Sequence, residues 1–238
     1  MIIFSLLHTT ARVPDGWMKA AKDFFEKCDR PQDVEYILTV DQADHDKMNC
    51  SYHHIPQFGD RLYLVNAKRP SNVDGWNLAA ANSTGRFLIT CSDDWFPPEH
   101  WDAGLLKALP CESNNELEHF PHLDGAYALD VDNSDNSNLM AFALVTRTYY
   151  ERYGYLFHPD YVGLMSDQEF TDVAKRDGVV VNARHLKFRH LNPDSGTVEW
   201  DEVYRRHRKL EDLEYGQEVY ERRKAAGFPP LPRGRAAA

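Results

Sequence analysis

The feature that most constrains the fold of this chain is an alternation of short apolar runs with amphipathic helical segments. Ile2 to Leu7 is a short apolar run that starts with β-branched residues, and Val34 to Val40 is a second apolar run. Between them, apolar residues from Trp17 to Phe25 recur at three- and four-residue steps, the period of an amphipathic helix. Strand, helix and strand in this order predict a parallel βαβ unit with a right-handed crossover. The chain is therefore expected to be an α/β protein.

The same pattern occurs a second time. Leu62 to Val65 is predicted to be a third strand, and a helix that starts at Asn72 is expected to end at Gly85, because glycine readily adopts the left-handed conformation found after helices. The next predicted strand, Phe87 to Thr90, leads directly to the pair Asp93-Asp94. Ligands of open α/β sheets bind at the carboxyl ends of the strands. Polar residues that follow the strands are therefore expected to meet in one crevice.

The second half of the chain is less regular. Residues 111–138 are rich in Glu, Asp, Asn and Ser and predict a surface loop, whereas Met140 to Thr146 predicts a strand. Helices are expected from Asp167 to Lys175 and around Tyr204 to Lys224.

Composition excludes several classes of protein. Of the 238 residues, 42% are hydrophobic, so the chain can bury a core and is neither disordered nor fibrous. The net charge of −10 disfavours a protein that coats nucleic acid through a basic face. No run reaches the roughly 20 apolar residues of a membrane span, so no integral membrane segment is expected. Four cysteines without CxxC spacing, and a start without a basic leader, predict a cytoplasmic protein with reduced thiols.

The adjacent carboxylates Asp93 and Asp94 are a candidate metal site. Neighbouring negative charges repel each other unless a cation or hydrogen-bond donors neutralise them, and carboxylate oxygens are suitable ligands for Mg²⁺ or Mn²⁺. Such pairs also start turns and cap helices. Taken by themselves, these two residues leave that alternative open.

Two segments place the aspartates in a wider pattern. Residues 77–101 read NLAAANSTGRFLITCSDDWFPPEHW, and residues 166–178 read SDQEFTDVAKRDG. Both resemble the family 2 glycosyltransferases of GT-A fold, in which an Asn-bearing helix, a glycine, a strand and an aspartate motif follow one another. The resemblance implies a Rossmann-like, mixed and mainly parallel sheet flanked by helices. It also implies inverting, metal-dependent transfer of a sugar from a nucleoside diphosphate sugar, with a UDP-sugar favoured, to a hydroxyl acceptor of unknown class.

The resemblance assigns roles to single residues. Asp167 matches the catalytic base of the family, although a helix-capping role is its alternative. Asp94 and His190 match metal ligands, with His185 as a near competitor for the histidine, so Mn²⁺ or Mg²⁺ is the implied cofactor. The residues expected to bind the nucleotide sugar are Thr9, Arg12, Asp41, Arg69, Asn77 and Asp93. Among them Arg12 and Arg69, with Lys68 as a further alternative, are candidates for a basic contact to the diphosphate, each of which could equally be a solvated surface charge.

The resemblance covers roughly residues 1–195. This part is predicted to be one GT-A domain, with a nucleotide-sugar-binding half (1–100) and an acceptor half (101–195), and residues 196–238 are expected to form a charged helical C-terminal extension. Cys91 departs from the family pattern, because many members carry an acid there, and Trp76 replaces the usual helix arginine.

Two other functions compete with the glycosyltransferase interpretation. A nucleotidyltransferase would also use strand-end aspartates and a metal, although the sequence has no Gly-rich phosphate loop. A non-catalytic module that binds nucleotide sugars or partner proteins could keep the same fold, and the departure at Cys91 favours it.

Overall fold

The structure is a computed structural model that describes residues 1–48, 61–110, 121–134, 138–193, 196–207 and 209–232. Within these residues, seven strands form one sheet in the order β3-β2-β1-β4-β7-β6-β8, and β5 pairs with β9 separately. The strands are β1 (Phe4–Thr10), β2 (Val34–Asp41), β3 (Arg61–Asn66), β4 (Phe87–Cys91), β5 (Trp95–Phe96), β6 (Ala128–Asp132), β7 (Leu144–Thr146), β8 (Val180–Lys187) and β9 (Arg189–His190).

The sheet is mixed and mainly parallel. β1 lies between β2 and β4 and runs parallel to both, with Leu7 opposite Ile37 on one side and Thr90 on the other. β3 continues the parallel set beside β2, whereas β7 runs antiparallel to β4 and to β6. The carboxyl ends of β1 to β4 therefore share one edge. This arrangement confirms the predicted α/β fold class.

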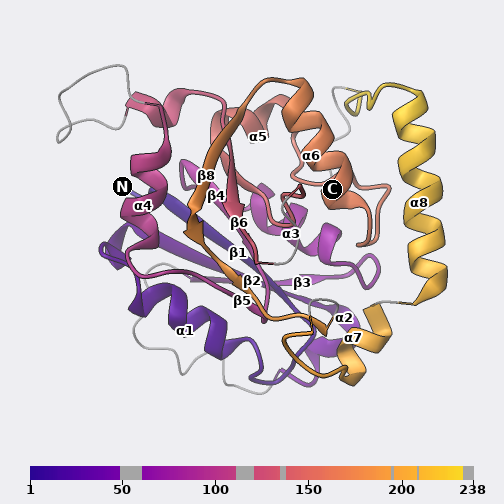
Figure 1. Ribbon diagram of the computed structural model, residues 1–238. Coiled ribbons are helices and arrows are strands. Elements are labelled where there is room, and N and C mark those ends of the chain that lie inside the picture. Colours follow the sequence, from indigo (N-terminus) through magenta and orange to yellow (C-terminus); the bar gives the residue numbers. More distant parts are fainter. Residues whose placement is uncertain (49–60, 111–120, 135–137, 194–195, 208, 233–238) are drawn as a thin grey trace.

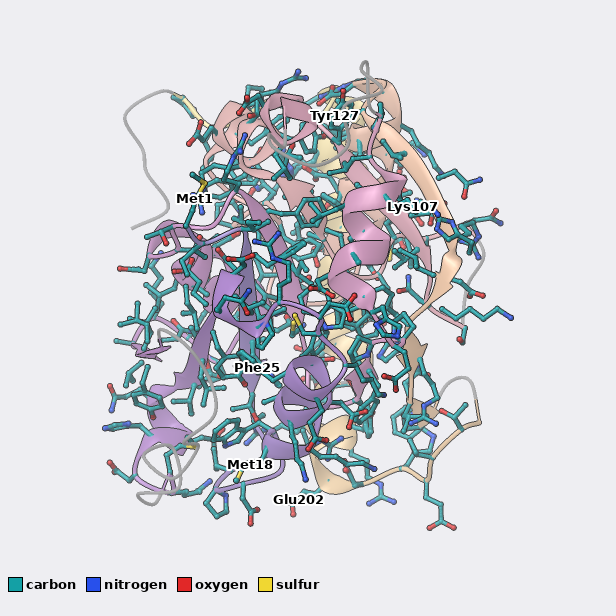
Figure 2. All side chains as sticks on the ribbon, turned by 90° about the vertical axis from the view of Figure 1, so that its left-hand side faces the viewer. Met1, Met18, Phe25, Lys107, Tyr127 and Glu202 are labelled. Atoms are coloured by element: carbon teal, nitrogen blue, oxygen red, sulfur yellow. The ribbon has the colours of Figure 1, made fainter. Side chains whose placement is uncertain are left out.

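Helices cover both faces of the sheet. Figure 1 shows α1 and α4 on one side, α3, α5 and α6 on the other, and α8 outside α6. Figure 2 looks onto the first of these faces, where α1 and α4 lie in front. The helices are α1 (Met18–Glu26), α2 (Gln42–His45), α3 (Asn72–Ala81), α4 (Trp101–Ala108), α5 (Arg147–Tyr153), α6 (Ser166–Arg176), α7 (Glu202–His207) and α8 (Leu210–Ala225).

Aromatic side chains fill the space between α1 and the sheet. Trp95 is fully buried and stacks between Phe142 and Phe188, with ring centroids 4.4 Å from each. Phe24 of α1 contacts Trp95 and Trp101, at centroid distances of 5.8 and 5.5 Å. The apolar face predicted for residues 17–25 is therefore buried, and it packs against Trp95 of β5.

The prediction that the helix from Asn72 ends at Gly85 was wrong. α3 ends at Ala81, and Gly85 instead lies just before β4, where its amide donates to Ser5 Oγ at 3.0 Å. A side chain at position 85 would collide with Ser5, so the glycine allows a close approach of two backbones. The first strand also differs, because β1 extends to Thr10 and so carries its polar end to the sheet edge.

The second half contains more regular structure than predicted. Part of the expected loop at residues 111–138 forms β6, and residues 111–120 and 135–137 lie outside the described residues. Only Leu144–Thr146 of the strand expected from Met140 is extended, and the helix expected around Tyr204 to Lys224 is two helices.

Of the cysteines, Cys28 and Cys91 are free thiols, and Cys50 and Cys111 fall outside the described ranges. In the described parts of the chain, no helix has the length and apolar character needed to cross a membrane.

Candidate active site

A cavity of about 240 Å³ opens at the carboxyl ends of β1, β2 and β4. The topology explains its position, because the loops after parallel strands meet at one edge of the sheet. Elements far apart in the sequence contribute to its wall, including the start of α6 and two residues of α7. The predicted site residues that line it are Thr9, Arg12, Asp41, Asp93, Asp94, Asp167 and His190.

Asp93 is held in place by the end of β1. Its carboxylate accepts a hydrogen bond from Thr10 Oγ1 at 3.0 Å and lies 3.0 Å from His8 Nε2. His8 is fully buried, and Tyr36 Oη lies 2.9 Å from its Nδ1. When this phenol donates to Nδ1, the proton on Nε2 is available for Asp93. This chain of hydrogen bonds from Tyr36 through His8 to Asp93 fixes the position of the carboxylate. Arg12 Nε lies 3.9 Å from it.

Asp94 and His190 form a pair inside the cavity. Pairing of β5 with β9 sets Trp95 opposite His190, and the Leu191 amide donates to the Asp94 carbonyl at 2.8 Å. As a result His190 Nε2 lies 3.7 Å from Asp94 Oδ1. His185, the alternative histidine, is exposed on β8 and does not line the cavity.

The carboxyl group of Asp94 is ionised at neutral pH. Burial alone raises its pKa, but hydrogen bonding and charge from His190, together with hydrogen bonds from Ser92 and Tyr204, outweigh burial and lower the pKa to about 2. The site therefore offers a carboxylate oxygen beside an imidazole nitrogen.

This pair fits a divalent cation such as Mn²⁺, which accepts both oxygen and imidazole ligands. The described residues contain no group of three or more His, Cys, Asp or Glu side chains placed to hold a metal. Within the described residues, Asp94 and His190 would be the two protein ligands of a cation bound here, and other oxygen atoms such as those of water would complete its coordination.

Asp41 lies at the end of β2, in a pocket of polar donors. Its Oδ1 accepts hydrogen bonds from Asn66 Nδ2 at 2.8 Å and from the Ser71 amide at 3.4 Å. Burial raises the pKa of Asp41, and these donors oppose the rise. The carboxylate is thereby fixed at the cavity wall, where it can accept a hydrogen bond from a ligand.

Asp167 is presented at the start of α6. Met165, with φ of 70°, precedes the helix and gives no side-chain cap, and Asp167 Oδ1 accepts a hydrogen bond from the Gln168 amide at 2.9 Å. The carboxylate thus contacts one first-turn amide and also lines the cavity. Geometry alone permits both the basic and the capping role.

Arg69 and Asn77 do not reach the cavity, contrary to expectation. Asn77 is buried on α3, where Nδ2 donates to the Phe157 carbonyl at 2.7 Å and Oδ1 accepts from the Leu156 amide at 2.9 Å. Arg69 donates to Asp74 at 2.8 Å and to the Tyr161 carbonyl at 2.7 Å. Both side chains therefore attach α3 and its preceding loop to residues 156–161. The spacing of Asn77 and Arg69 along the sequence does not predict that they have this structural role.

The departures at positions 76 and 91 have a structural explanation. Cys91 is fully buried and is not part of the cavity wall, so the cysteine removes no carboxylate from the cavity. Trp76 does line the cavity, and its Nε1 donates to the Cys91 carbonyl at 2.9 Å. Trp76, which the sequence marks only as a departure from the family pattern, thus contributes to the cavity wall, and His8 and Tyr204 contribute to the site without an assigned role in the sequence analysis. His8 lies next to Thr9, which the resemblance assigned to nucleotide-sugar binding, so its position at the end of the first strand was a signal for it.

No protein-family model matches the chain, and no curated protein matches its sequence. Solved structures do match its fold. S. aureus TarS 1-349 in complex with UDP-GlcNAc gives a TM-score of 0.58 at 12% identity, over 94% of this chain and 73% of that chain. Mannosyltransferase PcManGT from Pyrobaculum calidifontis, in complex with GDP-Man and Mn²⁺, gives 0.55 at 12% identity, over 94% and 75%. GalNAc-T7 with UDP, GalNAc and Mn²⁺ gives 0.58 at 11% identity, over 98% and 59%.

These similarities confirm the fold that the sequence motifs predicted. The chain has the GT-A fold, with a mixed, mainly parallel sheet flanked by helices.

Proposed function

We propose that the protein is a metal-dependent, inverting glycosyltransferase that moves a sugar from a nucleoside diphosphate sugar, with UDP-sugars favoured, to a hydroxyl acceptor. The observation that carries the proposal is the meeting of Asp94, His190 and Asp167 in one cavity. The first two form a metal-binding pair at the sheet edge, and the third comes from a separate helix. The fold supports the same class of reaction, because similar structures hold UDP-GlcNAc or GDP-Man with Mn²⁺.

The charge of the cavity supports a metal requirement. Among the described residues, the guanidinium of Arg12 is the one basic side chain of Lys or Arg that lines the wall, together with several carboxylates. A diphosphate would be repelled by these carboxylates unless a cation came with it. The carboxylates of the wall are Asp41, Asp93, Asp94, Asp167 and Asp212.

Each side chain then has a defined part in the reaction. A bound divalent metal supplies positive charge that stabilises the leaving diphosphate. Arg12 adds a hydrogen-bonding cation for the diphosphate, and Asp41 accepts a hydrogen bond from the base or the ribose. Asp167 takes the proton of the acceptor hydroxyl while the hydroxyl oxygen bonds to the anomeric carbon and the bond to the diphosphate breaks. One such displacement inverts the anomeric centre.

The substitution Asp167→Asn tests the catalytic role. We expect kcat for sugar release from a panel of UDP-sugars with Mn²⁺ to fall by about 10²–10⁴-fold, the usual contribution of general-base catalysis, while UDP affinity stays near that of the wild type. Asp172→Asn is a matched control on the same helix, because Asp172 accepts hydrogen bonds from Tyr220 and Gln168 and does not line the cavity. It should lower the melting temperature and leave kcat unchanged.

Two results would contradict this proposal. A lowered melting temperature with normal kcat in Asp167→Asn would show a cap, whose loss costs roughly 0.5–2 kcal/mol. Wild-type protein that binds UDP with Mn²⁺ but turns over no sugar nucleotide would identify a non-catalytic binding module.

A further inference from the structure

The start of α7 closes one side of the candidate site. Val203 and Tyr204 line the cavity, and Arg206 Nη2 lies 3.2 Å from Asp44 Oδ2 of α2. Figure 1 shows α7 next to α2, below the carboxyl ends of the strands. A segment of the C-terminal extension thus lies against the groups that are predicted to bind the donor.

Tyr204 is hydrogen-bonded to Asp94, the carboxylate of the proposed metal-binding pair Asp94 and His190. Its hydroxyl donates to Asp94 Oδ2, while Ser92 Oγ donates to Asp94 Oδ1. Both oxygens that could bind a cation therefore accept hydrogen bonds from the protein itself. The Leu191 carbonyl lies 2.6 Å from the same tyrosine oxygen, so the hydroxyl has a second acceptor close by when Asp94 is taken by another partner.

In the same way, Asp201 forms an ion pair with the guanidinium of Arg12. Arg12 Nη1 donates to Asp201, and the guanidinium carbon lies 4.7 Å from the centre of the Tyr204 ring. Asp201 is itself fixed at the start of α7, because its Oδ1 accepts from the Tyr204 amide at 2.8 Å. The Asp201 carboxylate thus pairs with Arg12, the positively charged side chain that is proposed to bind the donor diphosphate.

We propose that residues 201–204 are a self-blocking latch, in which Asp201 stands in for the donor diphosphate at Arg12 and Tyr204 stands in for the divalent cation at Asp94. This inference rests on the proposed function. Because Asp201 and Tyr204 belong to one short segment and are bonded to each other, displacing one loosens the other. Metal and diphosphate are therefore expected to bind with positive coupling, in the 5–150-fold range typical of linked sites.

Titrations with Mn²⁺ alone, UDP alone and each in the presence of the other test the latch. Tyr204→Phe removes the hydroxyl and keeps the ring against Arg12, so it should tighten Mn²⁺ binding in the absence of UDP by about fivefold or more. Asp201→Asn should do the same for UDP without metal. In the double variant the coupling factor should fall toward one. Tyr215→Phe is the matched control, because Tyr215 of α8 donates to the Asp160 carbonyl, which lies between α5 and α6, and its loss should change none of these constants.

Hydrogen exchange of amides 202–207 gives a readout that is independent of affinity. A latch that is displaced by its ligands exchanges faster when Mn²⁺ and UDP are added together. Slower exchange would show a segment that closes on the ligands, and would overturn the proposal.

The outcomes separate the two proposals. If the wild type binds Mn²⁺ and UDP but the Tyr204 and Asp201 variants bind them equally or more weakly, the latch is wrong and the proposed function stands. If only the double variant binds them, the latch is confirmed. If neither the wild type nor the double variant binds, both proposals fail.

Discussion

Asp94 is the residue on which the metal assignment depends. We expect Asp94→Asn to remove the Mn²⁺-dependent part of UDP affinity, because an amide offers neither the charge nor the basicity of a carboxylate. His190→Ala should have the same effect, to a smaller degree, since it removes the proposed nitrogen ligand. Isothermal titration of UDP with and without Mn²⁺ measures this part directly.

The control for Asp94→Asn is Asp130→Asn. Asp130 is also a partly buried carboxylate, but it pairs with Arg184 at 3.2 Å and is not part of the cavity wall. It should leave the metal-dependent affinity intact. Unchanged metal dependence in Asp94→Asn would refute the metal site.

His158 should make the fold sensitive to acid. Burial lowers its pKa to about 4, the charge of Arg223 adds to this effect, and the Asp160 amide donates to Nδ1 at 3.3 Å, which requires a neutral ring. The unfolded state takes up the proton near pH 6.5, so the free energy of unfolding should fall between about pH 6.5 and pH 4, by up to about 3 kcal/mol. Below pH 4 this histidine should cause no further loss.

Denaturant titrations of wild type and His158→Asn between pH 7.5 and pH 4 check this prediction. Their difference isolates the histidine from the carboxylates that titrate in both proteins. The variant should lose part of the acid dependence. Two curves separated by a constant offset would contradict the buried neutral histidine.

At the scale of residues, the sequence predicts positions better than side-chain directions. Asp93, Asp94 and Asp41 could be placed in one crevice because each follows a strand of a parallel sheet. Asn77 could not be excluded, because its hydrogen bonds go to a loop 80 residues further along the chain. Tyr204 could not be found, because its contact with Asp94 spans 110 residues and depends on how α7 packs.

A buried ion pair joins two elements, α6 and α8. Arg223 Nε and Nη2 lie 2.7 and 2.8 Å from the oxygens of Glu169, and the two side chains are 8% and 5% exposed. Tyr161 also donates to Glu169, at 2.9 Å. Helix α8 is therefore tied to the helix that presents Asp167 to the cavity.

We expect Arg223→Met to destabilise the protein by about 3–5 kcal/mol, because it leaves the Glu169 carboxylate buried without its cation. Arg222→Met is the matched control. This neighbour pairs with Asp160 at 2.7 Å but is 63% exposed, and exposed pairs contribute about 1 kcal/mol or less. Chemical denaturation measures both. Equal losses in the two variants would contradict the structural role of the buried pair.

At the scale of elements, the first half of the chain is the predictable half. Its strands and helices alternate and bury continuous apolar faces, so periodicity defines them. β6 was missed because its sequence ALDVD lies in a polar region, and it forms only through pairing with β7 and β8. The break between α7 and α8 was missed because charged residues continue across it.

At the scale of the whole molecule, charge opposes the binding of the proposed donor. The chain carries a net charge of −10, and the cavity wall adds local carboxylates. A nucleoside diphosphate is also an anion, so a metal-free complex has to overcome both repulsions.

Thermal melting with four mixtures tests this consequence. We expect UDP with EDTA, and Mn²⁺ without UDP, each to shift the melting temperature little. UDP and Mn²⁺ together should stabilise by about 2.7 kcal/mol at a hundredfold excess over Kd. For a chain of this size that corresponds to a rise of roughly 5–10 °C.

The salt dependence of metal-free UDP binding is a control for this prediction, because added salt is expected to strengthen the binding of this anion and not to weaken it. Anion binding that depends on a basic surface weakens as salt is added, whereas screening of a repulsive surface should strengthen metal-free UDP binding. Inorganic phosphate with Mn²⁺ serves as the ligand control and should cause no shift, since it lacks the base and ribose that Asp41 is proposed to contact. If UDP in EDTA raises the melting temperature as much as UDP with Mn²⁺, and more so at low salt, then the cavity binds the diphosphate without a cation and the metal-dependent mechanism is wrong.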